Sequence, residues 1–181
     1  MSSCCTPATN GTKTVAEGAD CCAEPYEQEA TPNTALIRHC PICSQKGKGV
    51  DTQTVKAMLD ISLHAIRHSG YGFCRTEDCP VVYFSLDGEQ TLDETDLRLL
   101  VHQKHPDDDE VYVCYCFRHT PGSIQAELVE TGQSTVVETV TRGTQNDECA
   151  CEIRNPQGNC CLGNVRAAVK RVALELQAVA I

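Results

Sequence analysis

Apolar side chains follow helical spacing most clearly near the carboxyl end of the chain. Over residues 162–180 they line one face and leave basic side chains outside it, which predicts a long amphipathic helix. A shorter helix is predicted from Thr120, an N-cap residue followed by proline at the first helical position, to Gly132. Another is predicted over residues 134–141, closing at Gly143.

β-Branched and aromatic residues gather in the middle of the chain instead. The run 80–84 predicts a strand, and the stretch 50–68 predicts a short strand followed by a helix. Residues 91–101 predict a short helix that begins with a capping box between Thr91 and Glu94. The expected fold class is therefore α+β, with a small α/β unit followed by a small helical domain.

Composition divides the chain into four parts. Residues 1–34 hold one lysine against five acids and few aliphatic side chains, which predicts a disordered tail. Proline followed by four consecutive acids marks 105–110 as an acidic linker. The expected folded domains are then 35–104 and 111–181.

Cysteine is the residue type that departs most from ordinary usage. The chain has 14 cysteines in 181 residues but only three Phe, five Tyr and no Trp, so its core needs a cross-link or a metal. The first residues have neither the basic nor the apolar region of a secretory signal, and no apolar run is long enough to span a membrane. These features predict a cytoplasmic protein, in which clustered cysteines are metal ligands rather than disulfides.

Charge and motifs narrow the expected partners. A formal net charge of −10 disfavours nucleic acid and anionic membrane surfaces and leaves metal ions as expected partners. The sequence has no glycine-rich phosphate loop, no nucleophile–base pair and no histidine–carboxylate metal triad. A conventional enzyme is therefore not expected, although metal-ion reduction stays open.

Two close pairs of cysteines suggest a zinc site. Cys40-x2-Cys43 and Cys74-x4-Cys79 can present four thiolates tetrahedrally, as Zn²⁺ prefers in closed structural sites. One such pair alone could equally be a redox dithiol. The second pair favours zinc, and the simplest interpretation is that this zinc has only a structural role.

A second constellation begins with Cys114-x-Cys116. One intervening residue brings two sulfurs close enough to share one iron of a cluster, and the complementary pair must come from four later cysteines: Cys149, Cys151, Cys160 and Cys161. Spacing alone leaves a second zinc site as a nearly equal alternative.

Four sequence blocks, in order and covering about three quarters of the chain, carry a family resemblance. They are Cys40-Pro41-x-Cys43, Tyr71-x-Phe73-Cys74-x4-Cys79-x-Val81-Val82-Tyr83-Phe84, Val113-Cys114-Tyr115-Cys116 and Cys151-x3-Asn155-Pro156-x-Gly158-x-Cys160-Cys161. With these blocks the chain resembles the N-terminal zinc and [2Fe–2S] domain of the CopZ copper-chaperone family. The second unit also resembles, more loosely, the helical [2Fe–2S] domain of bacterioferritin-associated ferredoxins.

The resemblance implies two metal sites with defined ligands. Zinc would be held by Cys40, Cys43, Cys74 and Cys79. A [2Fe–2S] cluster would be held by Cys114, Cys116, Cys151 and one of the vicinal pair, where Cys161 is favoured over Cys160 because it is nearer the start of the last helix. Cys149 departs from the family pattern and is expected to be a spare thiol.

The chain also departs from the family at its ends. In that family the domain is fused to a small copper-binding domain with its own Cys-x-x-Cys loop, which this sequence does not contain, so copper delivery by that domain is not implied. The first residues instead carry two vicinal thiol pairs suited to soft ions such as Cu(I) or Hg(II): Cys4, Cys5, Cys21 and Cys22.

Two functional classes follow from these features. The first is a redox or metal-trafficking protein for copper or other soft heavy metals, acting by one-electron transfer, metal-ion reduction or chaperoning toward a redox partner or a metal-transport protein. The alternative is a sensor or adaptor module, in which the cluster reports oxidants or metal stress without electron-transfer turnover.

Overall fold

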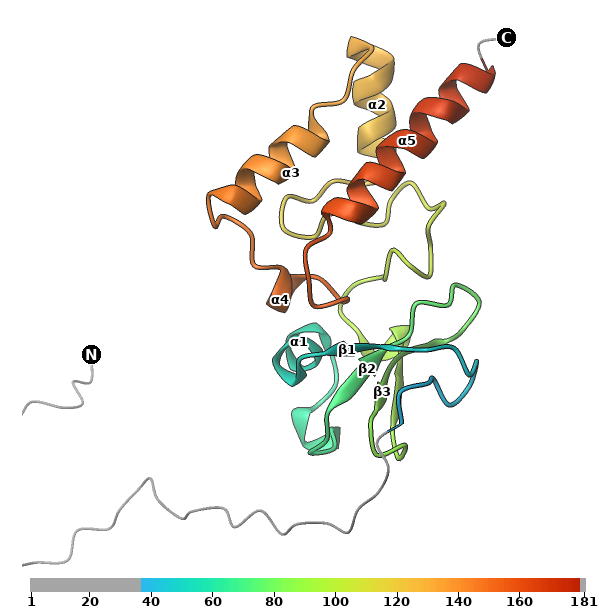
Figure 1. Ribbon diagram of the computed structural model, residues 1–181, viewed down its shortest axis with the longest axis vertical. Coiled ribbons are helices and arrows are strands. Elements are labelled where there is room, and N and C mark those ends of the chain that lie inside the picture. The colour runs from blue at the N-terminus through green and yellow to red at the C-terminus, as the bar shows by residue number, and fades with distance from the viewer. Residues whose placement is uncertain (1–36, 180–181) are drawn as a thin grey trace, which may run out of the picture. The chain divides into compact units, whose positions relative to one another are not determined.

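Residues 37–179 are described in a computed structural model, and their first half is built on a four-stranded antiparallel sheet (Figure 1). The strands follow chain order and are β1 (Lys48–Val50), β2 (Tyr71–Phe73), β3 (Val81–Ser85) and β4 (Thr91–Asp93). β3 confirms the strand expected over residues 80–84. Every residue of β2 and β3 is buried, because the sheet is covered on both faces.

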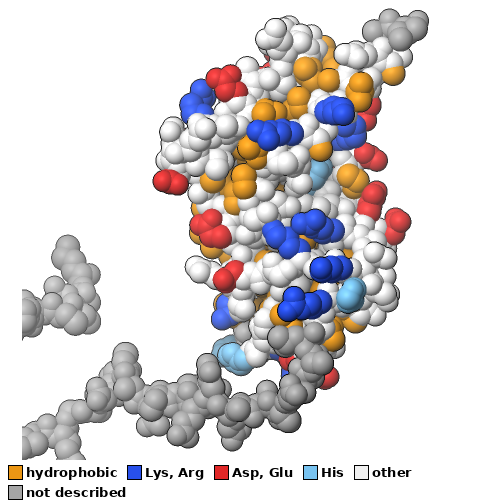
Figure 2. Space-filling model, viewed as in Figure 1, with side chains coloured by type: hydrophobic (Ala, Val, Ile, Leu, Met, Phe, Trp, Pro, Cys, Tyr) orange, Lys and Arg blue, Asp and Glu red, His pale blue; other side chains and the backbone are white. Residues whose placement is uncertain are grey.

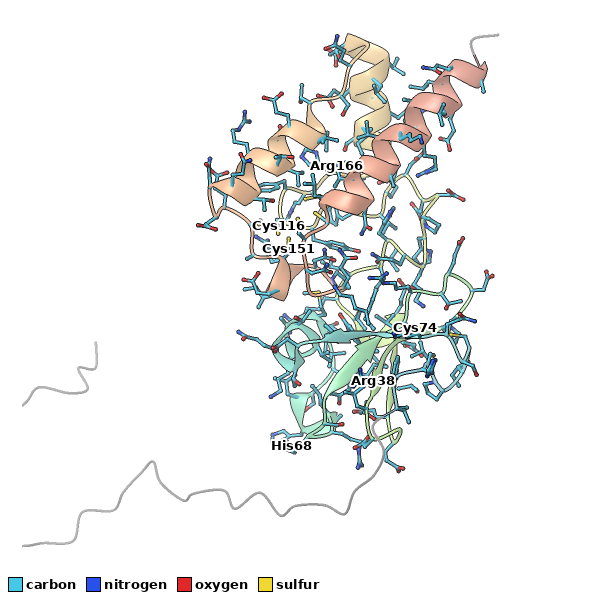
Figure 3. All side chains as sticks on the ribbon, viewed as in Figure 1. Arg38, His68, Cys74, Cys116, Cys151 and Arg166 are labelled. Carbon is cyan, nitrogen blue, oxygen red and sulfur yellow. The ribbon has the colours of Figure 1, made fainter. Side chains whose placement is uncertain are left out.

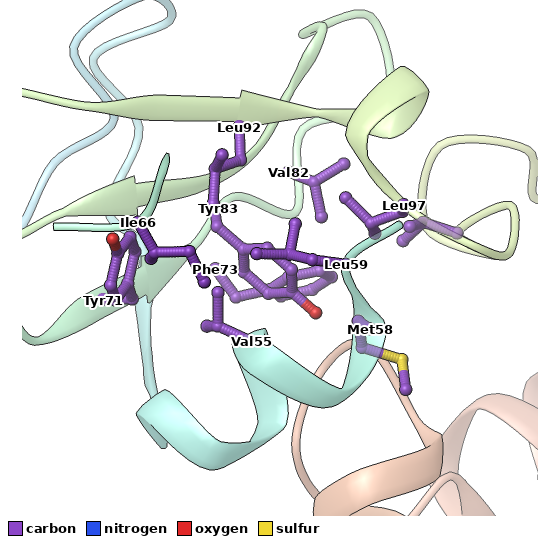
Figure 4. Close-up of a cluster of buried hydrophobic side chains, with 11 residues drawn as sticks. Val55, Met58, Leu59, Ile66, Tyr71, Phe73, Val82, Tyr83, Leu92 and Leu97 are labelled. Carbon is purple, nitrogen blue, oxygen red and sulfur yellow. The ribbon is translucent and has the colours of Figure 1, made fainter. Parts of the chain in front are cut away.

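The helix α1 (Thr52–Met58) packs its apolar side chains on the sheet (Figure 4). It begins where the Asp51 side chain accepts a hydrogen bond from the Gln53 amide at 2.7 Å, an N-cap contact. Val55 and Leu59 are fully buried against Phe73 and Tyr83. The helix is shorter than the stretch 50–68 predicted, and only a 3₁₀ turn, Leu63–Ala65, follows it.

The helix expected over residues 91–101 is not formed, and that prediction is wrong. Residues 91–93 form strand β4, followed by a single 3₁₀ turn, Glu94–Asp96. A capping box is present, but it joins Asp93 to Asp96 rather than Thr91 to Glu94. Pairing with β3 overrides the helical signal, since it places Leu92 in the core beside Tyr83.

Four helices make up the second half: α2 (Pro121–Thr131), α3 (Val136–Gln145), α4 (Cys151–Arg154) and α5 (Leu162–Val179). The expected start and end of α2 are confirmed, with a capping box between Thr120 and Ser123 and a left-handed Gly132. The long helix is confirmed as α5. Within residues 37–179 no helix has both the length and the hydrophobicity needed to cross a bilayer.

Gly143 does not close the helix before it, contrary to the prediction. It lies inside α3, which continues to Gln145. A Cβ atom at this position would lie 2.3 Å from the ring of Phe117. Gly143 therefore serves packing, by letting an aromatic ring approach the helix backbone, rather than helix termination.

The sheet and the helical half pack together through hydrogen bonds to α4 and the loop after it. The buried Tyr83 hydroxyl donates to the Pro156 carbonyl at 2.7 Å, and the Thr54 hydroxyl donates to the Glu152 carbonyl. α1 also packs along α4. The described residues accordingly belong to one compact unit.

The acidic segment 105–110 has specific contacts of its own. The Arg171 guanidinium lies 3.4 Å from the Asp107 carboxylate and donates to the Pro106 carbonyl at 2.8 Å. The Gly122 amide donates to the Asp109 carbonyl at 3.0 Å. The segment is thus held against α2 and α5, while the domain boundary expected there stays a prediction.

We predict that Gly72→Ala destabilises the protein and that Gly49→Ala does not. These two glycines face each other across β1 and β2, but an added Cβ at Gly72 would lie 2.3 Å from the buried ring of Phe84, whereas at Gly49 it would meet nothing within 4 Å. We expect Gly72→Ala to lower the free energy of unfolding by about 1–3 kcal/mol. Gly49→Ala should change it by less than about 0.5 kcal/mol. Urea denaturation of the zinc-loaded protein measures both, and equal effects would contradict this packing.

Candidate metal centres

Four cysteine thiols converge at one end of the sheet. The sulfurs of Cys40, Cys43, Cys74 and Cys79 all lie within 4.8 Å of one another. The Cys40 and Cys79 sulfurs are 3.7 Å apart, and those of Cys43 and Cys74 are 3.6 Å apart. Four sulfurs this close can surround a single ion, which is the closed tetrahedral arrangement that zinc adopts in structural sites. This is a four-cysteine metal site, formed by the two cysteine pairs that the spacing suggested.

Backbone turns present these thiols. The Cys40 amide donates to the Gln45 carbonyl at 2.8 Å, and the Ser44 amide donates to the Cys40 carbonyl at 2.9 Å. Ser44 takes a left-handed conformation, φ 58°, which closes this turn. Cys74 directly follows β2, and its amide donates to the Val82 carbonyl at 2.9 Å. The site is therefore attached to the sheet through main-chain hydrogen bonds.

The four thiols differ in acidity. Burial opposes ionisation of Cys43, but hydrogen bonding with the Thr76 hydroxyl, the Gln45 amide and neighbouring thiols lowers its pKa to about 6. Burial raises the pKa of Cys79 to about 12 and also raises that of Cys40. One thiolate is thus available near neutral pH, and a bound metal ion must displace protons from Cys40 and Cys79.

Lys104 is a part of this site that the sequence reasoning missed. Its buried ammonium donates to the Thr76 carbonyl at 2.6 Å and to the Cys79 carbonyl at 2.9 Å, so it fixes the loop between the second pair of cysteines. It also places a positive charge near a site that gains negative charge from four thiolates. The available signal was a lone lysine just after the buried Val101, in a stretch otherwise interpreted as helix and linker.

Basic side chains line a groove beside this site. Figure 2 shows lysine and arginine side chains over the sheet as well as over the helices. A groove of about 540 Å³ beside β1 is lined by four of them, and among the described residues none of the four forms an ion pair: Arg38, Lys46, Lys48 and Arg75. Burial, together with the charge of Arg75, lowers the pKa of Lys48. The charged side chains that line this groove are thus all basic, in spite of the net charge of −10.

The second group of cysteines lies between the helices and the loop after α4 (Figure 3). The sulfurs of Cys116 and Cys151 are 3.8 Å apart, and the Cys161 thiol lies near enough to those of Cys114 and Cys151 to alter their pKa. These neighbours join the early motif to the later one. The backbone amide of Ala150 also donates to the Cys116 sulfur at 3.4 Å.

This second group has a different shape from the first. Its members form an extended chain of thiols, and among the described residues only the first group brings three or more metal-ligating atoms within 4.8 Å of one another. The thiols of the second group are therefore less tightly gathered than those of the first. The arrangement fits a larger cofactor that needs four thiolates, which is the requirement of a two-iron cluster.

The thiols of the second group also differ in pKa. Hydrogen bonding from Cys161 lowers the pKa of Cys151 to about 6 and that of Cys114 to about 7. Burial raises the pKa of Cys116 to about 12. The pKa of Cys161 is raised because it shares hydrogen bonds with two thiols that ionise more easily.

A tight turn positions the vicinal pair at 160 and 161. The Asn155 side chain donates to the Asn159 carbonyl at 2.7 Å, and the Gln157 side chain donates to the Cys160 carbonyl at 3.1 Å. Gly158 has φ 67°, which a side chain would strain, and an added Cβ would lie 2.9 Å from Val50. The Asn-Pro-x-Gly motif is thus a buried turn pinned to the sheet half.

The structure distinguishes the remaining cysteines. Cys161 is buried among the thiols of the second group, whereas Cys160 is exposed to solvent. Cys149 is half-buried, and its thiol lies 3.9 Å from the Thr144 hydroxyl. The expected soft-metal ligands near the amino terminus lie outside the described residues: Cys4, Cys5, Cys21 and Cys22.

Comparison with known proteins agrees with this geometry. A family model described as a zinc-binding domain, zf_CopZ, matches residues 37–98, which include all four cysteines of the first site. The copper chaperone CopZ of Archaeoglobus fulgidus is 30% identical over 151 residues, covering 77% of this chain and 71% of the relative. The chain belongs to the CopZ family.

A solved structure of the CopZ family extends the match to the fold. The X-ray structure of the Archaeoglobus fulgidus CopZ N-terminal domain superposes with a TM-score of 0.60 at 29% sequence identity. The match covers 71% of this chain and 95% of that domain. Because nearly all of that CopZ domain is matched, the similarity reaches beyond the zinc-binding segment into the helical half that carries the second group of cysteines.

We predict that Lys104→Met weakens zinc binding at the first site. The substitution removes both hydrogen bonds to the loop that carries Cys79, and outer contacts of this kind typically change metal affinity by about 10- to 100-fold. Lys170→Met, on the exposed surface of α5, is the matched control and should leave zinc affinity unchanged. Competition with a chromophoric zinc chelator measures both, and an unaltered affinity in Lys104→Met would show that the lysine does not support the site.

Proposed function

We propose that this CopZ-family chain is a metal-handling redox protein with one structural zinc and one [2Fe–2S] cluster. Zinc is assigned to Cys40, Cys43, Cys74 and Cys79, and the cluster to Cys114, Cys116, Cys151 and Cys161. The observation that carries the proposal is the difference in shape between the two groups of thiols, one closed around a single point and one extended.

The first site supports a structural role for its metal. Three of its four cysteines are buried, together with Val81 and Phe84, in a cluster of apolar side chains. Four thiolates leave no open coordination position for a substrate. These cysteines therefore hold the end of the sheet in place and take no part in chemistry.

The second site supports a redox role. When bound, a [2Fe–2S] cluster supplies one-electron transfer. Residues of the chain would set its properties: the Ala150 amide points at the Cys116 sulfur, and Cys114 and Cys161 lie in the core of the helical half. Amide hydrogen bonds to sulfur and exclusion of water are the features that tune the potential of such a site.

The cargo we propose is copper or another soft metal. The relative named above is a copper chaperone, and the chain carries six cysteines beyond the eight assigned to the two sites. Soft thiolates favour Cu(I) and related ions. The expected cytoplasmic location, and a redox partner or metal-transport protein as the recipient, belong to this proposal.

We predict that Cys114→Ser removes iron and visible absorbance but leaves zinc in place. Cys114 contacts Cys161 in the second site and none of the thiols of the first. Cys40→Ser is the reciprocal variant and should lose zinc. Metal analysis and the visible spectrum of anaerobically purified protein provide the readout, and retained zinc also shows that the variant has folded.

The vicinal pair gives the proposal a sharper control. Cys161→Ser should lose the cluster in the same way, whereas Cys160→Ser should keep its visible spectrum, because Cys160 faces solvent. Loss of colour in Cys160→Ser, or joint loss of zinc and iron in Cys114→Ser, would contradict the assignment of two separate sites.

A further inference from the structure

Two cysteines near the second site are not used by either metal centre. Cys149 precedes α4 and Cys160 stands immediately before Cys161, so both lie next to assigned cluster ligands. Cys160 is exposed and Cys149 is half-buried, so both thiols are open to ions from solution. Neither is required to complete the four ligands of the cluster.

Both thiols lie close to one hydroxyl group. The Thr144 hydroxyl in α3 is 3.9 Å from the Cys149 sulfur and 3.9 Å from the Cys160 sulfur. Residues distant in sequence are thus brought together where α3, the start of α4 and the start of α5 meet. Cys149 also precedes Cys151 by two residues, which places the pair beside the cluster site.

The loop that carries Cys149 is held in position. Asp147 takes a left-handed conformation, φ 56°, and the Glu148 amide donates to the Gly143 carbonyl at 2.9 Å. These features turn the chain back over the end of α3, toward Thr144. Acids outnumber bases around the pair, since Asp147, Glu148 and Glu152 are exposed there against Arg154 alone between 144 and 160. The local charge favours a cation.

The chemistry of the pair selects a class of ion. Two thiols and a hydroxyl cannot satisfy zinc, which takes four strong donors in closed sites. Soft d¹⁰ ions such as Cu(I) prefer sulfur donors and are suited by thiolates without hard ligands. On binding, each thiol gives its proton to solvent and forms one metal–sulfur bond, with no change in oxidation state.

We propose that Cys149 and Cys160 form a two-thiolate site for a soft d¹⁰ cation, Cu(I) in particular, at the solvent-facing edge of the cluster site. The inference rests on the metal-handling function proposed above and names the residues that would receive the ion. It gives Cys149, a spare thiol by family pattern, a specific partner and a role. It also explains an exposed cysteine beside a buried ligand.

The test is an anaerobic titration of the full chain with Cu(I) against a chromophoric Cu(I) chelator. The four cysteines near the amino terminus are first replaced, C4S/C5S/C21S/C22S, to remove competing thiols. This background protein should retain one equivalent of Cu(I), and adding C149S/C160S should abolish that retention. Either single substitution, C149S or C160S, should abolish it as well, because two-coordinate binding needs both sulfurs.

Matched control substitutions distinguish loss of the Cu(I) ligands from a general effect of mutating this part of the surface. Gln145→Ser and Asn159→Ser change exposed residues close to Thr144 and Cys160 and should retain the ion. Zinc content and the visible spectrum of the cluster should be the same in C149S/C160S as in the background protein. The proposal is overturned if the background protein retains no Cu(I), if C149S/C160S still retains it, or if C160S loses the visible spectrum.

The readout also separates this inference from the function on which it rests. Chelator absorbance reports Cu(I) whether or not a cluster is present. If the chain never assembles a cluster but loses Cu(I) on C149S/C160S substitution, the proposed redox function is contradicted and the proposed Cu(I) site is supported. If the cluster forms and Cu(I) retention does not depend on Cys149 and Cys160, the redox function is supported and the Cu(I) site is contradicted.

Discussion

Buried thiols are the constraint on which the rest of this structure depends. Cysteines from both groups of thiols lie in hydrophobic clusters: Cys40, Cys74 and Cys79 pack with Val81 and Phe84, and Cys114 and Cys161 pack in the core of the helical half. Ionised sulfurs in such surroundings repel one another and lose hydration. A bound metal ion offsets this repulsion because its positive charge replaces the thiol protons. Metal binding and folding of the core are therefore coupled.

The same contacts link the two centres. The loop 155–159 carries Cys161 into the second site, and the buried Tyr83 hydroxyl of the sheet donates a hydrogen bond to its Pro156 carbonyl. Burial strongly raises the pKa of Tyr83, so its hydroxyl stays protonated and remains a donor. On the other side, Lys104, which follows the sheet half, holds the carbonyls around Cys79. Each site therefore depends on residues outside its own cysteine motif.

Much of the fold could be predicted from local signals. The capping box at Thr120 and the glycine at position 132 fix both ends of α2, and the run of β-branched and aromatic residues fixes β3. The predictions that failed concern segments where tertiary contacts outweigh the local sequence signals. Thr91 to Asp93 pair with β3 instead of starting a helix, and Gly143 makes room for Phe117 instead of ending one.

The metal sites, like the fold, could be predicted from the sequence only in part. Spacing identified the cysteines that converge at the first site, because knuckle turns are local. For the vicinal pair it favoured Cys161 only because that residue is nearer the last helix, and the structure buries Cys161 and exposes Cys160. It could not find Lys104, or the approach of Thr144 to both Cys149 and Cys160, because these juxtapositions exist only once the helices have packed.

The central claim is that the closed and the extended groups of thiols bind different cofactors. Metal analysis of the anaerobically purified full chain, with visible spectra before and after dithionite, tests it most directly. The account predicts about one zinc and about two irons per chain, with a visible band that dithionite bleaches. Two zincs per chain and no colour, even after anaerobic reconstitution with iron and sulfide, would contradict it.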